Sequence, residues 1–284
     1  MSVRHAAVLT ALVAATCVTV DALQTFTSGV DAVRVDVLVT ADGQPVKGLR
    51  AGDFDIRDNG VPQRVELVSF EEIPLSVVLA LDMSGSVSQD GLEHLTRAGQ
   101  AILEGLEKDD RAALITFSHL VVQRSGLSND LGRLRAALSA AKPAGATSLI
   151  DASQAAMIVA ESTNSRGLVV LFSDGVDTSS WLSRDLVLAT ARRSEAVVYS
   201  VAVGRTHDDF LDTLTELTGG RLLRAETTTA VRSLFLQVLH EFRHRYVVSY
   251  SPRGVERGGW HRLQVRVHRR NTVVRARPGY VAGR

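Results

Sequence analysis

An apolar run that ends in a cluster of oxygen-bearing side chains constrains the fold of this chain more than any other feature. Residues 75–81 are rich in Val and Leu, and the chain continues as Asp82-Met83-Ser84-Gly85-Ser86. A short continuous apolar run predicts a strand that is buried on both faces, as in a parallel sheet. Because ligands of open α/β sheets bind outside the carboxyl ends of the strands, the carboxylate and two hydroxyls predict a binding site there.

Apolar strands alternate with helical segments from residue 73 onward, which is the pattern of a doubly wound, mostly parallel sheet. We predict strands at 75–81, 111–117, 167–173 and 197–203, with a short edge strand near 119–124. We predict helices at 89–107, 129–141, 148–163, 183–195, 208–218 and 227–243, with Thr147 as a candidate N-cap. This part of the chain therefore predicts a Rossmann-like α/β domain.

Both ends of the chain carry the two-residue alternation of half-buried strands. At the N-terminal end this holds for residues 30–40, for 53–57 before the hairpin signal Asn59-Gly60, and for 63–70. At the C-terminal end it holds for segments beginning at Tyr246, at Arg262 and at Thr272. Since three short strands are marginal alone, we predict that the two ends pair into one small β-sandwich-like unit.

The charges bear on the class of partner. The 284 residues have a formal net charge of +1, which gives no overall electrostatic bias toward nucleic acid. Locally, residues 243–284 contain eleven arginines and one acid, whereas residues 31–72 contain nine acids. The alternation of these arginines with apolar residues favours solvated strand faces, some opposite the acidic strands, over a binding surface for an anionic polymer.

The first residues resemble an export signal. Arg4 and His5 precede an apolar run from Ala6 to Val20, and Ala22 offers a small residue for cleavage. The run is shorter than the ~20 residues of a membrane span, which favours a cleaved signal over a retained anchor. We therefore expect a periplasmic or extracellular protein with no membrane span after cleavage and, because Cys17 lies in the signal, no cysteine.

Two further loops supply oxygen ligands at the same end of the predicted sheet. One carries Thr147 in Gly145-Ala146-Thr147-Ser148, and the other carries Asp174 at the end of a predicted strand, followed by Gly175. Together the three loops offer the candidate ligands Asp82, Ser84, Ser86, Thr147 and Asp174. Oxygen-only ligands of this kind suit a hard divalent cation, Mg²⁺ in the first place and Mn²⁺ or Ca²⁺ as alternatives.

The order and spacing of D-x-S-x-S, Thr and Asp-Gly resemble the metal-ion-dependent adhesion site (MIDAS) of the von Willebrand factor type A domain, over residues 73–245. The resemblance implies that Ser84, Ser86 and Thr147 contact Mg²⁺, and that Asp82 and Asp174 act directly or through water. It implies that water or a partner protein's carboxylate completes the coordination. The flanks, including YVVSYSP from Tyr246 and the terminal RPGY, are similar to an exported bacterial VWFA-related subfamily.

The resemblance and the strand pattern together divide the chain into four parts. They are a signal peptide over 1–22, an N-terminal β unit over 23–72, a von Willebrand type A domain over 73–245 and C-terminal strands over 246–284. On this interpretation the chain is a non-enzymatic, exported protein-binding module. A structural module with a vestigial metal site is an alternative.

A zinc hydrolase is the principal enzymatic alternative, because His240-Glu241-Phe242-Arg243-His244 matches H-E-x-x-H. Three features argue against it: the flanking arginines, the strand pattern that starts at Tyr246, and the lack of a third ligand at a familiar spacing. A subtilisin-like hydrolase is a weaker alternative, since GATSLIDA has only a faint similarity to a nucleophile segment and no matching histidine motif exists. His207 with the acids after it is better explained as the start of a helix.

Overall fold

The computed structural model describes residues 32–70, 73–174, 176–203 and 209–283. The expected export signal and Gly175 lie outside the described residues, as do His207 and the start of the helix expected at 208–218. Within the described ranges no helix combines the length and the apolar character needed to cross a bilayer.

A six-stranded sheet forms the centre of the α/β part, in the order β11-β10-β9-β6-β7-β8. All neighbours in this sheet are parallel except the edge pair β7 and β8. Its strands are β6 (Leu75–Asp82), β7 (Arg111–Phe117), β8 (Val121–Ser128), β9 (Arg166–Ser173), β10 (Val197–Val203) and β11 (Leu222–Ala225). Every residue of β6 is buried, as expected for a central strand covered on both faces.

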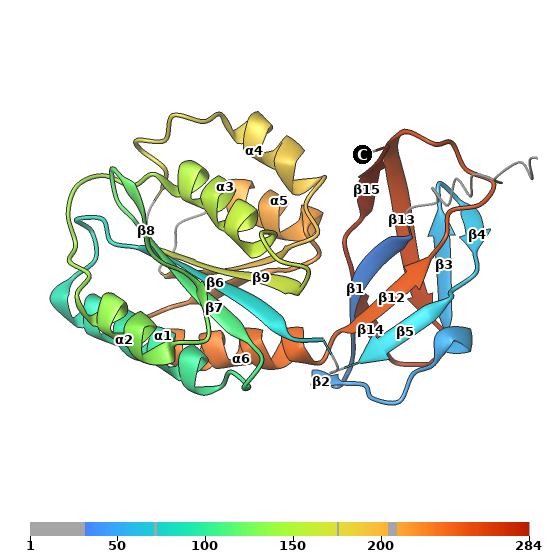
Figure 1. Ribbon diagram of the computed structural model, residues 1–284, viewed down its shortest axis with the longest axis horizontal. Coiled ribbons are helices and arrows are strands. Elements are labelled where there is room, and N and C mark those ends of the chain that lie inside the picture. The colour runs from blue at the N-terminus through green and yellow to red at the C-terminus, as the bar shows by residue number, and fades with distance from the viewer. Residues whose placement is uncertain (1–31, 71–72, 175, 204–208, 284) are drawn as a thin grey trace, which may run out of the picture. The chain divides into compact units, whose positions relative to one another are not determined.

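Helices cover both faces of this sheet (Figure 1). One face packs against α1 (Gln89–Glu104), α2 (Leu131–Ser139) and α6 (Val231–Arg243). The other packs against α3 (Leu149–Ala160), α4 (Arg184–Ala191) and α5 (Asp209–Leu217). A 3-10 turn, η2 (Thr228–Ala230), precedes α6.

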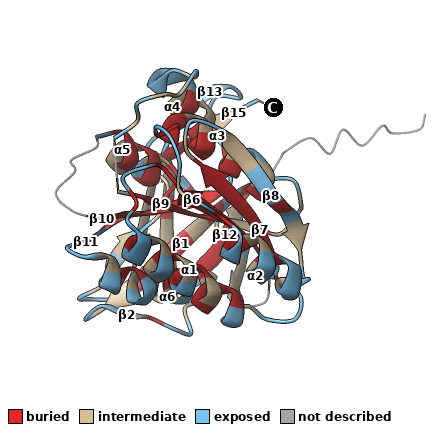
Figure 2. Ribbon diagram, turned by 90° about the vertical axis from the view of Figure 1, so that its left-hand side faces the viewer, coloured by how far each residue is buried: buried red, intermediate tan, exposed pale blue. Residues whose placement is uncertain are grey.

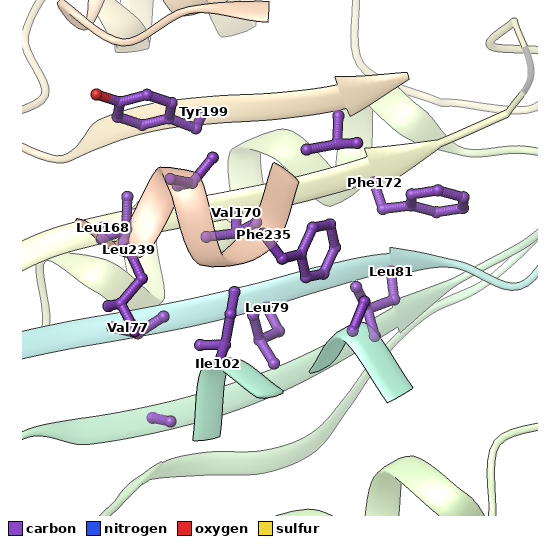
Figure 3. Close-up of a cluster of buried hydrophobic side chains, with 14 of the residues drawn as sticks. Val77, Leu79, Leu81, Ile102, Leu168, Val170, Phe172, Tyr199, Phe235 and Leu239 are labelled. Atoms are coloured by element: carbon purple, nitrogen blue, oxygen red, sulfur yellow. The ribbon is translucent and has the colours of Figure 1, made fainter. Parts of the chain in front are cut away.

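The alternation of side chains along each strand divides the apolar core into two layers. Val77, Leu79 and Leu81 of β6 face the first group of helices, whereas Val78 and Ala80 face the second. Figure 3 shows the first layer, in which strand residues meet Ile102 of α1 and Phe235 and Leu239 of α6. In Figure 2 the buried residues follow these central strands. Packing on both faces thus holds β6 in place, with Asp82 at its carboxyl end.

The strands at the two chain ends form two antiparallel sheets, each of which mixes N-terminal and C-terminal strands. The five-stranded sheet has the order β14-β1-β12-β5, with β2 beside β1, and the four-stranded sheet has the order β15-β13-β3-β4. The N-terminal strands are β1 (Val33–Ala41), β2 (Gln44–Pro45), β3 (Phe54–Asp58), β4 (Val61–Gln63) and β5 (Leu67–Phe70), with the 3-10 turn η1 (Ala51–Asp53) before β3. The C-terminal strands are β12 (Tyr246–Tyr250), β13 (Gly259–Val267), β14 (Val273–Arg275) and β15 (Gly279–Ala282).

The predicted fold class is confirmed: a mostly parallel α/β sheet accompanies a β unit made from both ends of the chain. Several element predictions are corrected. The edge strand β8 runs to Ser128 rather than 124, the helix predicted from 227 starts as the 3-10 turn, and the short strands β11 and β15 were not expected. The single strand predicted at 63–70 is divided between β4, which ends at Gln63, and β5, which belongs to the other sheet. Strand β11 is short, so its alternation is too weak to separate it from a loop in the sequence.

A buried polar cluster joins the two chain ends inside the β unit. The fully buried carboxylate of Asp58 accepts hydrogen bonds from Tyr250 (2.9 Å) and Tyr280 (2.8 Å), and it lies 2.7 Å from His261 Nδ1. Burial raises the pKa of both tyrosines, and the charge of Asp58 raises each further, so both remain protonated donors. In the register of β3 and β13, the half-buried Asp55 lies directly across from Arg266. The buried Asp58 therefore has two tyrosines and a histidine as its partners, and not the arginines of the C-terminal strands.

Arginines connect the β unit to the α/β part within residues 31–284. The fully buried Arg245 donates to Tyr199 Oη (2.9 Å), to the carbonyl of Gly219 (2.6 Å) and to the carbonyl of Asp36 (3.3 Å). Arg166 donates through Nε to Asp36 Oδ1 (3.0 Å). These bonds fix the short segment between α6 and β12.

We predict that Arg245→Ala lowers the free energy of unfolding by about 3 kcal/mol or more, because it leaves several buried acceptors without a donor. Arg266→Ala is the matched control, since Arg266 is exposed and its loss is expected to cost less than about 0.5 kcal/mol. Urea denaturation of the two variants measures both values. Equal stability of the two variants would contradict a structural role for Arg245.

Candidate metal centre

Asp82 is the most deeply placed residue of the candidate centre, at the carboxyl end of β6. Its side chain has no exposed surface, its Oδ1 accepts the backbone N–H of Ser84 (2.9 Å), and its Oδ2 accepts the hydroxyl of Ser173 (2.7 Å). Ser173 was not predicted as part of the site. The sequence could have indicated Ser173, because it precedes Asp174 at the end of β9 and therefore lies at the same edge of the sheet.

A chain of side-chain oxygens runs from the first loop to the third. Ser84 Oγ lies 2.9 Å from Ser86 Oγ, and Ser86 Oγ donates to Asp174 Oδ1 at 2.9 Å. Ser84 is buried, whereas Ser86 is exposed and Asp174 is half-buried. The structure thus brings together Asp82, Ser84, Ser86 and Asp174, and the group opens toward solvent at its Ser86 and Asp174 end.

Thr147, the fifth predicted residue, lies on a loop that is bonded to the first loop through the backbone. Gly85 N–H donates to the carbonyl of Gly145 (2.9 Å), and Ala144 N–H donates to the carbonyl of Met83 (2.8 Å). Gly145 has a φ of +75°, and a Cβ there would lie 2.2 Å from His119 Nδ1. Only glycine fits this position, which brings the loop carrying the buried Thr147 against the Asp82 loop.

The start of α3 is capped by a different group from the one predicted. Thr147 was expected to be the N-cap, but Ser148 occupies that position and makes no side-chain capping bond. Instead, the segment after Asp174 supplies the acceptors: Asp177 Oδ1 accepts from Ile150 N–H (3.1 Å), and Ser180 Oγ accepts from Asp151 N–H (3.1 Å). A partner distant in sequence cannot be recognised from local cap patterns.

The electrostatics of this group favour a cation. Burial raises the pKa of Asp82, hydrogen bonds from Ser84 and Ser173 oppose that rise, and the charge of Asp174 raises the pKa further. The two carboxylates and the hydroxyls of Ser84 and Ser86 form an oxygen-only donor set, which is the kind that Mg²⁺, Mn²⁺ and Ca²⁺ take. A bound divalent ion would offset both the desolvation of Asp82 and its repulsion from Asp174. The residues present therefore fit a hard divalent cation.

The H-E-x-x-H segment lies elsewhere and is used structurally. The rings of His240 and His244 lie with centroids 4.2 Å apart and are tilted by 46° at the end of α6, but Glu241 between them in sequence is buried and has other partners. Its carboxylate accepts from Gln237 Nε2 (3.0 Å), Tyr199 Oη (3.3 Å) and Arg221. A carboxylate committed to these bonds is poorly placed to act as a general base, and no group of three His, Cys, Asp or Glu side chains in the described ranges is arranged to hold a metal.

A polar cavity of about 250 Å³ lies away from the candidate centre, near the start of β9 and strand β1. Its charged lining residues largely satisfy one another: Arg34 pairs with Glu195 (2.7 Å) and Arg166 with Asp36. Glu161 accepts from the hydroxyl of Ser194 (2.6 Å). Three arginines and three acids line the cavity, so the lining carries no net charge that would attract an ionic ligand. We therefore place the candidate site at the carboxyl ends of β6 and β9.

Similarity to known proteins agrees with this geometry. Residues 77–177 match the family model of the von Willebrand factor type A domain, a range that contains all five candidate ligands. No curated protein matches the sequence significantly.

Several solved structures share this fold at low sequence identity. Proximal thread matrix protein 1 from the mussel byssus has a TM-score of 0.56 at 14% identity, and the match covers 65% of this chain but only 50% of that one. A second structure of that protein has a zinc-occupied MIDAS motif, with a TM-score of 0.56, 14% identity and coverage of 65% and 49%. A von Willebrand factor type A protein from Catenulispora acidiphila has a TM-score of 0.55 at 10% identity and covers 89% of this chain and 74% of its own. The corresponding domain of the type V pilus tip protein Mfa5 from Porphyromonas gingivalis has a TM-score of 0.50 at 12% identity, with coverage of 59% and 94%.

We predict that the contribution of Asp82 to the stability of the metal-free protein declines as the pH rises. The pKa of Asp82 is higher in the folded protein than in the unfolded chain, so the folded state binds more protons. The stabilisation that this protonation gives is complete below the unfolded pKa of about 4, and it is lost as the pH rises through the raised pKa of the folded state. Asp82→Asn cannot titrate, so in EDTA the melting temperature of Asp82→Asn should rise relative to wild type over this range. Added Mg²⁺ should stabilise wild type and leave Asp82→Asn unchanged. A difference between the two proteins that did not vary with pH would contradict this role for Asp82.

Proposed function

We propose that this chain, which contains a von Willebrand factor type A domain, is an exported protein-binding module that recognises its partner through a bound Mg²⁺ ion. The observation that carries the proposal is the hydrogen-bonded group in which Asp82 accepts from the Ser84 backbone and the hydroxyls of Ser84 and Ser86 lead to the carboxylate of Asp174. Strand order joins these residues from separate parts of the chain at one edge of the sheet. The proposed ligands are Asp82, Ser84, Ser86, Thr147 and Asp174.

The choice of Mg²⁺ rests on the donor atoms. The zinc-occupied motif of the mussel protein supports a divalent metal at this type of site. In this chain the candidate donors are all oxygens, whereas zinc sites usually include imidazole or thiolate ligands. Mg²⁺ keeps water ligands and is seldom enclosed by protein alone, so Mg²⁺ suits a site that is open at Ser86 and Asp174. Mn²⁺ and Ca²⁺ are alternatives of the same chemical class.

The proposed partner is a protein that presents a carboxylate. The two protein carboxylates only neutralise the +2 charge of Mg²⁺. The bound ion therefore keeps affinity for one more anionic oxygen. The pilus tip protein, which contains a domain of this fold, supports a role in interaction between proteins. We propose that the chain is not an enzyme, because the family that the centre resembles consists of binding modules, and the carboxylate of Glu241 in the H-E-x-x-H segment is bonded to Tyr199, Gln237 and Arg221. Export is proposed from the signal-like residues 1–22.

We predict that titration of the metal-free full chain with Mg²⁺ in a calorimeter gives saturable binding. Asp82→Ala should weaken this binding by more than about 100-fold, since even outer-shell changes typically cost about 10–100-fold. His240→Ala and Asp185→Ala should keep the wild-type affinity; Asp185 is an exposed acid in the first turn of α4 and serves as the matched control.

Other outcomes would identify a different function. Tight Zn²⁺ binding that is lost in His240→Ala but kept in Asp82→Ala would favour the hydrolase alternative and call for a peptidase assay. A folded wild-type chain that binds none of Mg²⁺, Mn²⁺, Ca²⁺ or Zn²⁺ would favour a structural module with a vestigial site.

A further inference from the structure

The four-stranded sheet of the β unit has an outer face that points away from the core. Leu263 and Val265 of β13 and Ile56 of β3 contribute to the apolar cluster of the β unit, so the residues between them point to the opposite face. Strand β13 lies between β15 and β3 (Figure 1). The outer face therefore carries Trp260, Arg262, Gln264 and Arg266 from β13, and Asp55 and Arg57 from β3.

The arginines of this face have little acidic compensation. From the sequence we expected some C-terminal arginines to lie opposite acids of the N-terminal strands. Asp55 lies across from Arg266 and 3.7 Å from Arg57, but in the described part of the chain neither Arg262 nor Arg266 forms an ion pair. Both are exposed, and 44% of the Arg57 side chain is accessible. The outer face thus has an excess of positive charge.

The backbone positions of these arginines form a row. Arg262 and Arg266 are four residues apart on β13, which corresponds to about 13–14 Å along the strand. Arg57 lies across from Gln264, midway between them. Because diagonal neighbours in an antiparallel pair are about 7–8 Å apart, the row advances in steps of that size. It fits a ligand whose negative charges repeat along a chain.

Trp260 extends the row at the end next to Arg262. Its ring lies over Gly279 of β15, where an added Cβ would come within 2.4 Å of the indole. The glycine leaves room for the indole on the sheet surface, and 41% of Trp260 remains accessible. The guanidinium of Arg192, at the end of α4, lies 5.9 Å from the ring centroid. We call Arg192, Trp260, Arg262, Arg57 and Arg266 the arginine row.

The turns on both sides of β13 add to this charge. Arg257 before the strand and Arg269 and Arg270 after it are exposed, and Glu256 is the only acid in the two turns, residues 251–258 and 268–272. A surface with charges of one sign attracts ligands of the opposite charge.

We infer that the arginine row binds an acidic polysaccharide, a linear chain of sugar rings that carry carboxylates. Guanidinium groups pair with carboxylates through two parallel hydrogen bonds. The indole of Trp260 offers an apolar surface to one face of a sugar ring, and the amide of Gln264 offers a donor and an acceptor to hydroxyl groups. This site lies in the β unit, contains no candidate metal ligand and does not depend on the proposed metal-bridged function.

Two observations favour a polysaccharide over other anionic partners. The formal net charge of +1 lacks the general basic bias of nucleic-acid-binding domains. A membrane contact inserts apolar side chains among the lipids, whereas the indole of Trp260 lies against Gly279 in the sheet. Nucleic acid and anionic lipid are therefore tested as competing ligands.

The inference is tested with a mannuronate decasaccharide, which has one carboxylate on each ring. Its binding to the full chain is measured by calorimetry in EDTA at several salt concentrations, so that the metal centre contributes nothing. The variants are the double variant Arg262→Ala, Arg266→Ala and the single variants Trp260→Ala, Trp260→Phe and Asp82→Ala. Neutral maltodextrin, oligodeoxythymidylate and phosphatidylglycerol vesicles are titrated in parallel.

The matched control is the double variant Arg133→Ala, Arg232→Ala. These arginines are exposed on α2 and α6, outside the β unit, and their removal changes the net charge by the same amount. Melting temperatures establish that each variant is folded.

We expect the decasaccharide to bind wild type, more weakly as salt rises because binding releases counterions, and we expect no binding of maltodextrin. The Arg262→Ala, Arg266→Ala variant should lose at least about tenfold in affinity and part of the salt dependence. Trp260→Ala should weaken binding at unchanged salt dependence, and Trp260→Phe should recover part of the loss. The matched control and Asp82→Ala should bind like wild type.

Several results would overturn the inference. They are a folded wild-type chain that does not bind the decasaccharide at low salt, and equal binding by the Arg262→Ala, Arg266→Ala variant and the matched control. Tighter binding of oligodeoxythymidylate or of the vesicles, lost in the same variant, would make the row a nucleic-acid or lipid contact instead. None of these outcomes affects the metal-bridged function, which the Mg²⁺ titration tests separately.

Discussion

The burial of β6 on both faces is the constraint on which the other features of the α/β part depend. Val77, Leu79 and Leu81 contribute to one core layer, and Val78 and Ala80 contribute to the other, so the strand cannot shift by one residue without exchanging its two apolar faces. With β6 in this register, Asp82 lies at the carboxyl end of the sheet beside β9. The position of the candidate metal centre is therefore a consequence of core packing.

The candidate centre combines a fixed base with an open side. Asp82 is immobilised by Ser84 and Ser173 and is shielded from water, while Ser86 and Asp174 lie nearer to solvent. A buried carboxylate that faces a second carboxylate is unfavourable without a positive charge, so the same burial that destabilises the charged form of Asp82 favours a cation. Without an ion, the desolvation of Asp82 and its repulsion from Asp174 are unfavourable, and a bound divalent ion would offset both.

The β unit depends on strands from both ends of the chain, which couples it to the end of α6. Two residues separate α6 from β12, and one of them is the buried Arg245. Arg243, the last residue of α6, donates to Asp110 (2.6 Å), whose other oxygen accepts the N–H of Leu75 at the start of β6 (2.8 Å). The opposite end of β6 from Asp82 is thus tied to the end of α6, so the central strand is linked to both the candidate centre and the β unit.

Local patterns in the sequence predicted most of the elements and the candidate ligands that follow them. The apolar run of β6, the alternation of β1 and β13, and the carboxylate and hydroxyls after β6 are all local patterns, and local patterns follow from the periodicity of strands and helices. They were sufficient for the fold class, for the joining of the two chain ends and for the candidate ligands Asp82, Ser84, Ser86, Thr147 and Asp174.

Contacts between side chains that are distant in sequence could be identified only in the tertiary structure. Ser173 supports Asp82, Asp177 and Ser180 cap α3 in place of Thr147, and the carboxylate of Glu241 is bound to Arg221 rather than free for catalysis. The exposure of Trp181 belongs to the same class, because the sequence shows a tryptophan but not what covers it. Each depends on which side chains meet after the strands are ordered and the helices packed, and this is set by the free energy of the whole fold rather than by spacing along the chain.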